Sequence, residues 1–336
     1  MGLQIGEIIS RREIELHELK GKTIAVDAFN AIYQFLSSIR QPDGTPLMDS
    51  AGNITSHLSG IFYRNTSLLA DGIKLIYVFD GEYHFLKGKT QEMRGEIKKT
   101  AREKYEKAKE EEDIDSMRKY ANGFIKLNDE MISECKELLE AMGIPVIQAP
   151  GEGEMQCAQL VKDGEAWAVG SQDYDALVVG GSRLLQNLTL SKKRKTANGY
   201  VDITTEIIDY QQVLNELEIN ADQLISLAIL VGTDFNPKGI KGIGPKKALA
   251  LVRQKKYPVE IFREVEHQVD FDWKEVFEIF KKPNVRKNLD VKFPKLSEEK
   301  IINLLVEKHE FSLDRVKKNL EKLHILKKKS AQRTLF

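Results

Sequence analysis

Four short apolar runs separated by helical patterns restrict the folds that this chain can adopt. The runs are KTIAV at 22–26, IKLIYVFDG at 73–81, IPVIQAP at 144–150 and AWAVGSQDYDALVV at 166–179. Nearly continuous apolar runs of this length are typical of strands buried on both faces, and strands that alternate with helices form parallel sheets. We therefore predict an α/β protein with a mainly parallel central sheet flanked by helices.

The segments between and after these runs predict helices and two further strands. Helical patterns cover residues 28–39, 56–71 and 221–234. Residues 92–142 contain no proline, are heavily charged and also indicate helix, so they separate the second strand from the third as an insertion would. Two further strands are expected within 184–190 and 200–208, on either side of a basic loop at 191–199.

The overall charge leaves the binding partner open. The chain has 336 residues, about the length of two domains, with 51 Lys and Arg against 51 Asp and Glu. Because these cancel, only a local concentration of basic residues can indicate a nucleic-acid partner. No apolar stretch is long enough to predict a membrane span. Cys135 and Cys157 form no pairing pattern and are expected to be small buried hydrophobes in a reducing compartment.

Acidic residues follow the predicted strands. Asp27, Asp80, Glu152 and Asp173 each come directly after a separate apolar run or after a short turn. The carboxyl ends of parallel strands meet at one edge of a sheet, where ligands bind in α/β proteins. Three more acids extend the set, namely Glu154, Asp175 and Asp234. If 169–173 is a strand, Asp173 and Asp175 point toward the same face, because side chains alternate along a strand.

Two explanations compete for these acids. Taken singly, an Asp between a strand and a helix is usually an N-cap. Seven carboxylates at one edge would repel one another, however, and keeping most of them protonated at pH 7 would need large pKa shifts. Divalent cations with oxygen ligands remove the repulsion, and Mg²⁺ takes one or two direct carboxylates while it keeps several waters. The pattern therefore suits two metal ions, which form a clamp for phosphodiester hydrolysis.

Other phosphate chemistries fit less well. GKT occurs at 21–23 and 88–90, but Leu16 and Tyr83 stand where a P-loop requires glycine. The DYDAL stretch has the DxD spacing of aspartyl phosphatases, but it leaves the flanking acids unexplained.

Residues 236–256 form a basic segment with seven Lys or Arg and no acid. Within it, GIKGIGPKKAL has glycines for a tight turn and then begins a helix, so its free N–H groups could bind phosphate oxygens. Lysines at such a site neutralise the DNA backbone without reading bases. We interpret the segment as a helix-hairpin-helix; the alternative is a solvated basic loop.

Five motifs together resemble one family. AVDAFNAIYQFL, YVFDGE, APGEGEMQCA, GSQDYDALV and LVGTDFNPKGIKGIG occur in the order and at the spacing of the flap endonucleases, members of the structure-specific 5′-nuclease superfamily. The resemblance extends from Met1 to about Leu323, and the length and short tail are most similar to the archaeal members. It implies a PIN-like 5′-nuclease fold with a helical arch.

The resemblance also implies an activity. It predicts Mg²⁺-dependent cleavage of 5′ flaps at DNA duplex junctions, with 5′–3′ exonuclease activity, in replication, including Okazaki fragment maturation, and in repair. Two Mg²⁺ ions per site, replaceable by Mn²⁺, would be held by Asp27, Asp80, Glu152, Glu154, Asp173, Asp175 and Asp234. Lys87 and Arg94 match a catalytic basic pair at the foot of the arch, and their seven-residue spacing favours one helix face. Tyr33 matches an aromatic that stacks on a base; its alternative is a core aromatic.

The remaining implications concern DNA contacts and domain limits. Duplex contacts are expected from Arg40, Thr55, Arg64, Lys241, Gly242, Gly244, Lys246 and Lys247. A single nuclease domain would cover 1–323, with an N-terminal part at 1–83, the arch at 84–130, an internal part at 131–234 and the hairpin with C-terminal helices at 235–323.

The C-terminal tail, 324–336, is basic and ends in QRTLF. Gln332, Leu335 and Phe336 match the start of a sliding-clamp peptide, which normally continues further, so clamp binding is expected to be weakened. The resemblance further implies a monomer without a membrane partner, cytoplasmic and nucleoid-associated in an archaeon, or nuclear in a eukaryote. A non-catalytic, clamp-associated junction scaffold is the alternative function, and gapped duplexes or RNA-primed ends are alternative substrates.

Overall fold

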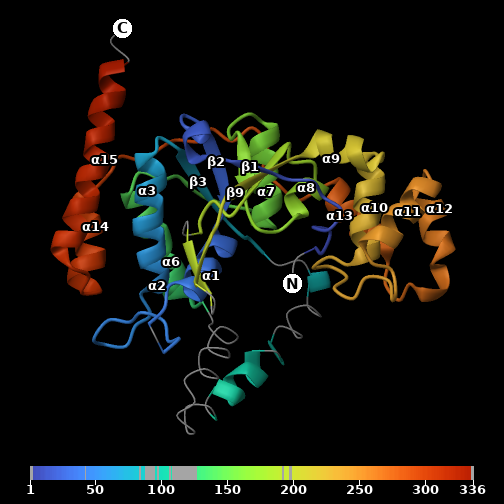
Figure 1. Ribbon diagram of the computed structural model, residues 1–336, viewed down its shortest axis with the longest axis horizontal. Helices are drawn as coiled ribbons and strands as arrows, with labels where there is room; N and C mark the ends of the chain where they lie inside the picture. Colours follow the sequence, from blue (N-terminus) through green and yellow to red (C-terminus); the bar gives the residue numbers. More distant parts are fainter. Residues whose placement is uncertain are drawn as a thin grey trace.

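A central sheet organises the computed structural model, which describes residues 3–41, 43–82, 85–87, 95–96, 98–105, 107, 127–190, 193–196 and 199–333 (Figure 1). The described strands form a seven-stranded sheet in the order β1-β9-β6-β5-β2-β3-β4, and β7 pairs with β8. The strands of the large sheet are β1 (Arg12–Ile14), β2 (Thr23–Asp27), β3 (Lys74–Phe79), β4 (Val146–Gln148), β5 (Ala168–Gly170), β6 (Arg183–Gln186) and β9 (Thr205–Asp209).

Strand direction confirms the predicted sheet. The pairs β2–β3, β2–β5, β3–β4 and β5–β6 are parallel, whereas β9 is antiparallel to both β6 and β1. The ends of β2, β3 and β5 therefore lie along one edge of the sheet.

Helices cover both faces of the sheet. One face carries α1 (Ala28–Ser38), α2 (Ser56–Ser59), α3 (Asn65–Ala70), α6 (Asp129–Ala141), α14 (Glu298–Ile302) and α15 (Leu313–Arg333). The other carries α7 (Gly153–Lys162), α8 (Asp175–Val178) and α9 (Tyr210–Leu217). This layer continues beyond the sheet through α10 (Ala221–Val231), which packs against α8 and is contacted in turn by α11 (Pro245–Gln254), α12 (Pro258–Glu264) and α13 (Trp273–Lys281). Figure 1 shows α14 and α15 at one end of the molecule and α11 and α12 at the other.

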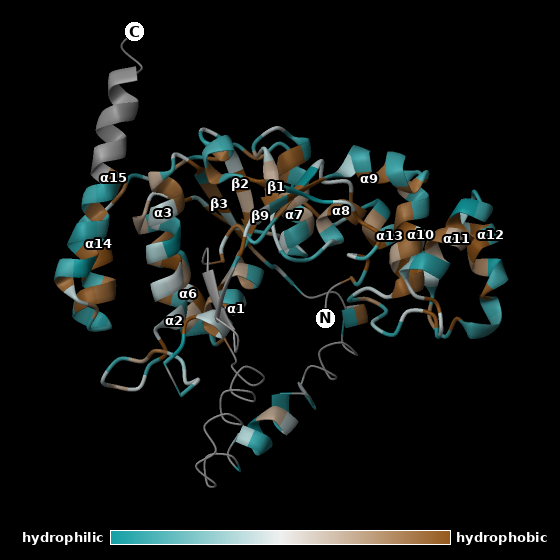
Figure 2. Cartoon of the chain, viewed as in Figure 1, coloured by the Kyte–Doolittle hydropathy of each residue, from teal (hydrophilic) through white to brown (hydrophobic). Residues whose placement is uncertain are grey.

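Strand alternation divides the core between these two layers. In β2, Ile24 and Val26 belong to the cluster beneath α1 and α6, whereas Ala25 belongs to the cluster beneath α7 and α10. Figure 2 shows hydrophobic residues concentrated on the strands and on the helix faces toward them. The described residues contain no helix long and apolar enough to cross a membrane.

Three local predictions are wrong. The strand expected through Asp173 ends at Gly170, and residues 171–174 form a bend before α8 begins at Asp175. The helix expected over 92–142 is interrupted at 127–128, where the Asn128 side chain accepts a hydrogen bond from Met131 N and starts α6. Within this range, residues 92–94, 97, 106 and 108–126 lie outside the described residues.

The third difference concerns the basic loop and the strand after it. Lys193–Thr196 is strand β7, which pairs antiparallel with β8 (Gly199–Asp202). The pattern at 200–208 therefore contains parts of two strands, because Ile203 and Thr204 separate β8 from β9.

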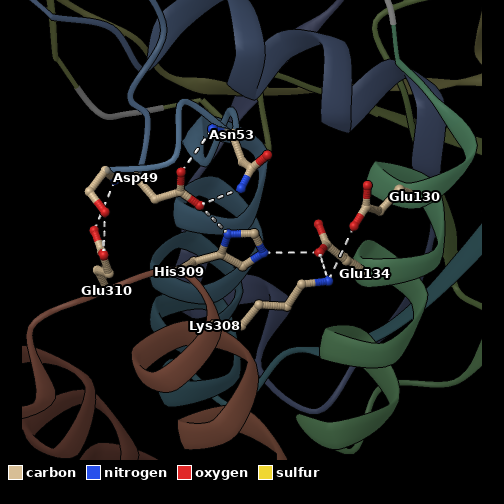
Figure 3. Close-up of polar contacts among 8 residues, drawn as sticks. Asp49, Asn53, Glu130, Glu134, Lys308, His309 and Glu310 are labelled. Atoms are coloured by element: carbon tan, nitrogen blue, oxygen red, sulfur yellow. Dashed lines mark hydrogen bonds and ion pairs between the residues drawn. The ribbon is translucent and has the colours of Figure 1, made fainter.

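A buried polar network fastens the C-terminal helices to the rest of the fold. His309 follows a π-helical turn (Asn303–Lys308); its Nδ1 lies 2.9 Å from Asp49 Oδ2 and its Nε2 lies 2.9 Å from Glu134 Oε1. Figure 3 shows the ring between these two carboxylates, with the Lys308 ammonium also reaching Glu134, at 2.6 Å. The network joins the 41–55 loop, α6 and the C-terminal segment.

Candidate active site

Asp27 and Asp80 reach the site from the ends of adjacent strands. Asp27 ends β2 and caps α1, because its Oδ1 accepts a hydrogen bond of 3.1 Å from Asn30 N. Asp80 directly follows β3, and its Oδ1 accepts a 2.7 Å bond from Gly153 N. A Cβ at Gly153 would lie 2.7 Å from that same oxygen, so only glycine permits this approach. The cap expected for a single acid is thus present at Asp27, and it coexists with the clustering.

The acids of the second layer come from α7 and α8. Glu152 is the N-cap residue of α7, and Glu154 lies in its first turn. The Glu154 Oε1 accepts a 3.2 Å bond from Ala176 N, so α7 holds the start of α8. Asp175 is the first residue of α8, and its Oδ1 is a buried oxygen without a hydrogen-bond partner. An unpaired buried carboxylate oxygen is costly, so this atom indicates a missing electropositive partner.

Asp234 is positioned by a folded turn after α10. The Asn236 Oδ1 accepts bonds from Thr233 N and Thr233 Oγ1, while its Nδ2 donates to Ile229 O at 2.7 Å. Gly239 lies against this turn with φ of 53°, and a Cβ there would stand 2.3 Å from Val231 O. The side chain of Asn236, which the sequence patterns did not single out, thus shapes the loop that carries Asp234.

The electrostatics indicate that the acids share one region. Burial, followed by repulsion from Asp80, raises the pKa of Asp27 well above its usual range. Burial, followed by repulsion from Glu152, raises the pKa of Asp80 to about 6. Burial, followed by repulsion from Asp175, Asp173 and Asp27, raises the pKa of Glu154 well above its usual range.

Asp175 completes this set of coupled acids. Burial and then repulsion from Asp173, Asp234 and Glu152 raise its pKa to about 7. The structure therefore brings all seven acids together at the edge where the parallel strands end.

Lys87 supplies positive charge within this group. It ends a short 3₁₀ turn (Phe85–Lys87), and its ammonium pairs with Glu152 and lies 3.5 Å from Asp234 Oδ2. Its Nζ is also 5.2 Å from the Phe235 ring centroid. Burial alone would lower the pKa of Lys87, but attraction to Glu152 and Asp234 outweighs it, so the pKa lies above its ordinary value. The lysine is therefore charged and points into the acidic edge.

The carboxylate oxygens are ligands that divalent cations prefer, but the described residues are not arranged as a finished coordination site. Among the described residues, no group of three His, Cys, Asp or Glu side chains could hold a metal ion as it stands. The Lys87 ammonium lies among the carboxylates, so ligation would require these side chains to move. Seven carboxylates, several with raised pKa values, together with the orphaned Asp175 oxygen, still fit hard cations that prefer oxygen ligands.

The other catalytic and stacking candidates are Arg94 and Tyr33. Tyr33, on α1, is 41% exposed, and the Lys98 ammonium lies 5.5 Å from its ring centroid. Its exposure disagrees with the alternative of a core aromatic. Arg94 lies outside the described residues, so the helix face expected to be shared with Lys87 stays a prediction.

The basic segment forms the expected turn between two helices. It connects α10 to α11, with Gly242 at φ of 78° and Gly244 as the N-cap residue of α11. Lys246 is exposed and lies 3.7 Å from Glu7, while the Lys247 ammonium donates to Gly242 O at 3.1 Å. Lys241 is exposed on the same turn.

Three residues predicted to contact duplex DNA are instead hydrogen-bonded or buried within the protein. Arg40 donates to Ser37 O and Gly44 O. Arg64 donates twice to Leu188 O, at 3.2 and 2.6 Å, and Thr55 is buried just before α2. These contacts shape the 41–55 loop and the segment after β6.

Of the predicted clamp-binding residues, Gln332 lies in the last turn of α15, whereas Leu335 and Phe336 lie outside the described residues.

Comparisons with known proteins agree with the motifs. The family model of the XPG N-terminal domain matches residues 2–101, and that of the XPG I-region matches residues 143–234. The chain is 51% identical to Flap endonuclease 1 of Pyrococcus furiosus over 337 residues, which covers 100% of this chain and 98% of that relative.

Solved structures give the same result. Flap endonuclease-1 from Methanococcus jannaschii superposes with a TM-score of 0.76 at 43% identity, covering 97% of this chain and 98% of that one. The catalytic core of Rad2 in complex with DNA substrate shares the fold, with a TM-score of 0.70 at 23% identity, covering 95% of this chain and 97% of that one. The family indicated by the motifs is confirmed: the chain belongs to the flap endonuclease 1 family.

Proposed function

We propose that this chain cleaves 5′ flaps at DNA duplex junctions, by hydrolysis that depends on divalent cations at the acidic edge. Family membership supports flap endonuclease activity. The single structural observation that carries the metal dependence is the gathering of seven acids from separate segments, four of them with raised pKa values. Such a set is stable as carboxylates only beside positive charge.

The proposed ligands are the seven acids Asp27, Asp80, Glu152, Glu154, Asp173, Asp175 and Asp234, for two Mg²⁺ ions replaceable by Mn²⁺. Bound divalent cations would lower the pKa of a water and stabilise charge that develops on the phosphate. The chain's own groups bind and orient the substrate. Lys87, already charged and directed into this edge, would neutralise a phosphate oxygen, and Arg94 would assist it.

DNA binding is proposed to depend on shape rather than sequence. The turn around Gly242 and Gly244 would grip one duplex arm through phosphates, with Lys241, Lys246 and Lys247 supplying charge. Tyr33 exposes a ring on which a base near the cut could stack. Arg40, Thr55 and Arg64 would act by shaping the surface for the other arm. The arch proposed for 84–130 would receive the 5′ single strand.

The remaining proposals concern the domain limits, the cellular process and the protein partner. We expect a monomeric nuclease domain at 1–323, active in replication and repair beside the nucleoid. The tail with Gln332, Leu335 and Phe336 would bind a sliding clamp weakly. The scaffold alternative predicts loss of one or more of the seven acids, and all seven are present.

One comparison tests the proposed function. End-labelled 5′ flap, nicked, gapped and bubble DNA are incubated with the protein in Mg²⁺ and in EDTA. We expect cutting at the flap junction in Mg²⁺ and none in EDTA. Binding without cutting under every condition would support the scaffold, and preferential cutting of gapped duplexes would change the proposed substrate.

A further inference from the structure

The bend at 171–174 needs something other than a strand to orient Asp173. Because β5 ends at Gly170, alternation along a strand does not direct this side chain. Within the bend, Asp173 N donates to Ser171 Oγ at 3.2 Å, and Gln172 O accepts a 2.8 Å bond from Gln186 Nε2. These bonds hold the backbone but leave the Asp173 carboxylate to be placed by other groups.

Asn30, in the first turn of α1, contacts this bend and both neighbouring acids. Its Oδ1 accepts a 3.2 Å bond from Gln172 N, and its Nδ2 donates a 3.3 Å bond to Asp173 Oδ2. Its backbone N–H donates to Asp27 Oδ1 at 3.1 Å. One residue thus joins the acid that ends β2 to the acid that follows β5, although the two lie far apart in the sequence.

The chemistry of the position favours an amide. Only an uncharged group that both accepts and donates can satisfy a backbone N–H and a carboxylate at once. An aspartate would present a second carboxylate to Asp173, and an aliphatic side chain would leave Gln172 N and Asp173 Oδ2 without these partners. The donor and acceptor requirements also fix which way the amide faces.

We propose that Asn30 is a positioning residue, which holds Asp27 and Asp173 in fixed relative orientation so that they can bind a divalent cation. This inference rests on the proposed metal-dependent function and names a residue that acts through the acids. Hydrogen-bond partners of metal ligands typically contribute about 10- to 100-fold in metal affinity or activity. We therefore assign to Asn30 a share of the site's cation affinity.

Gln34 provides a matched control on the same helix. It lies one turn after Asn30, so it projects from the same side of α1. Its Oε1 accepts a hydrogen bond from Thr189 Oγ1, which docks α1 on the segment after β6 without touching an acid. If Asn30 only helps to dock α1, substitutions at Asn30 and at Gln34 should change Mn²⁺ binding and the melting temperature in the same way.

The test compares Asn30→Leu, Asn30→Ala and Gln34→Leu with the unaltered full chain. Binding of Mn²⁺ alone, without DNA, is measured by electron paramagnetic resonance; thermal unfolding in EDTA and the Mg²⁺ concentration for half-maximal flap cleavage are measured in parallel. We expect both Asn30 variants to weaken Mn²⁺ binding by roughly tenfold or more and to raise the half-maximal Mg²⁺ concentration. Gln34→Leu should lower the melting temperature but bind Mn²⁺ as the unaltered chain does.

Two contrary outcomes would overturn the positioning role of Asn30, and a third would refute the proposed function. Unchanged Mn²⁺ binding in folded Asn30 variants, beside normal metal-dependent cleavage by the unaltered chain, would overturn the positioning role alone. Equal weakening by Asn30→Leu and Gln34→Leu would also overturn it, since docking of α1 would then explain both. Failure of the unaltered chain to bind Mn²⁺ or to cut flaps would instead refute the proposed function.

Discussion

At the scale of single residues, the site depends on how negative charge is compensated. Lys87 is 9% exposed and pairs with Glu152. The carboxylates around it raise one another's pKa values by mutual repulsion. A buried ammonium at this position stabilises the acidic edge when no metal is bound. Metal ions would take over part of that role, so Lys87 would become available to a phosphate.

Replacing Lys87 by Met should therefore destabilise the metal-free protein more than the metal-bound one. Loss of one partner from a buried ion pair costs about 3 kcal/mol or more. We expect thermal unfolding in EDTA to show a clearly lower melting temperature for Lys87→Met, and excess Mg²⁺ to recover most of the difference. An equal loss with and without Mg²⁺ would mean that the lysine does not compensate the acids.

The residues of the site were only partly predictable. Four of the seven acids could be found because each follows a strand-like run, and the rule that parallel strands end at one edge brings them together. Glu154, Asp175 and Asp234 were added to the set from their places beside these acids or after a helical pattern. Asn30 and Asn236 could not be found in the same way, because an Asn near a helix or turn looks like an ordinary local cap. Their contacts to Asp173 and Thr233 emerge only from tertiary structure. The strand predicted through Asp173 was wrong, because the chain bends after Gly170 and the local pattern does not show this bend.

At the scale of elements, the 41–55 loop depends on a distant segment. Within this loop, the Asp49 carboxylate accepts a hydrogen bond from Asn53 N. It also contacts His309, which lies 260 residues further along the chain. Hydrogen bonds from Asn53 and then His309 lower the pKa of Asp49 to about 2. His57 on α2 and Glu134 and Glu130 on α6 also face this network, as do Lys308 and Glu310 beside His309.

This shift predicts a pH-dependent contribution to stability. Because the folded pKa of Asp49 is depressed, its contribution is present above the unfolded pKa, about 3.9, and is lost as pH falls toward 2. Asp49→Asn should thus be less stable than the unaltered chain at pH 6, and the two should converge near pH 2. Urea unfolding at a series of pH values measures the gap. A gap that stays constant down to pH 2 would contradict the assignment.

Element boundaries were predictable where a local signal exists. Strand runs and the start of α10, which Asn220 caps with a capping box, follow from the sequence. The break before α6 was missed because its charged helical pattern continues across Asn128. The β7–β8 pair was missed because a run of Lys and Arg resembles a solvated loop, whereas cross-strand pairing decides the conformation.

At the scale of the whole molecule, the proposed function combines an acidic edge with a basic turn on a chain with zero formal net charge. The turn between α10 and α11 follows directly from the segment that carries Asp234, so DNA bound at the turn, as proposed, would lie close to the acids along the chain. The proposal therefore predicts affinity that depends on backbone charge and cutting that depends on junction shape.

Replacing Lys246 and Lys247 together by Ala should weaken binding to all duplex sequences alike. The slope of log affinity against log salt concentration should become shallower by about 1 to 2, since each lysine neutralises roughly one phosphate. Fluorescence anisotropy at several salt concentrations measures this slope. Lys317→Ala with Lys318→Ala, at exposed positions on α15, is the matched control. A loss confined to particular sequences would contradict backbone recognition.

The most direct test of the metal-dependent site is flap cleavage by Asp175→Asn, which keeps the shape of the residue but removes its charge. The control is Asp290→Asn, at an exposed acid paired with Lys292. We predict that Asp175→Asn lowers the cleavage rate in Mg²⁺ by at least about 100-fold, while flap binding in Ca²⁺ and the activity of the control stay unchanged. Cleavage by Asp175→Asn at the unaltered rate would contradict the central claim that this acidic edge holds the catalytic metal.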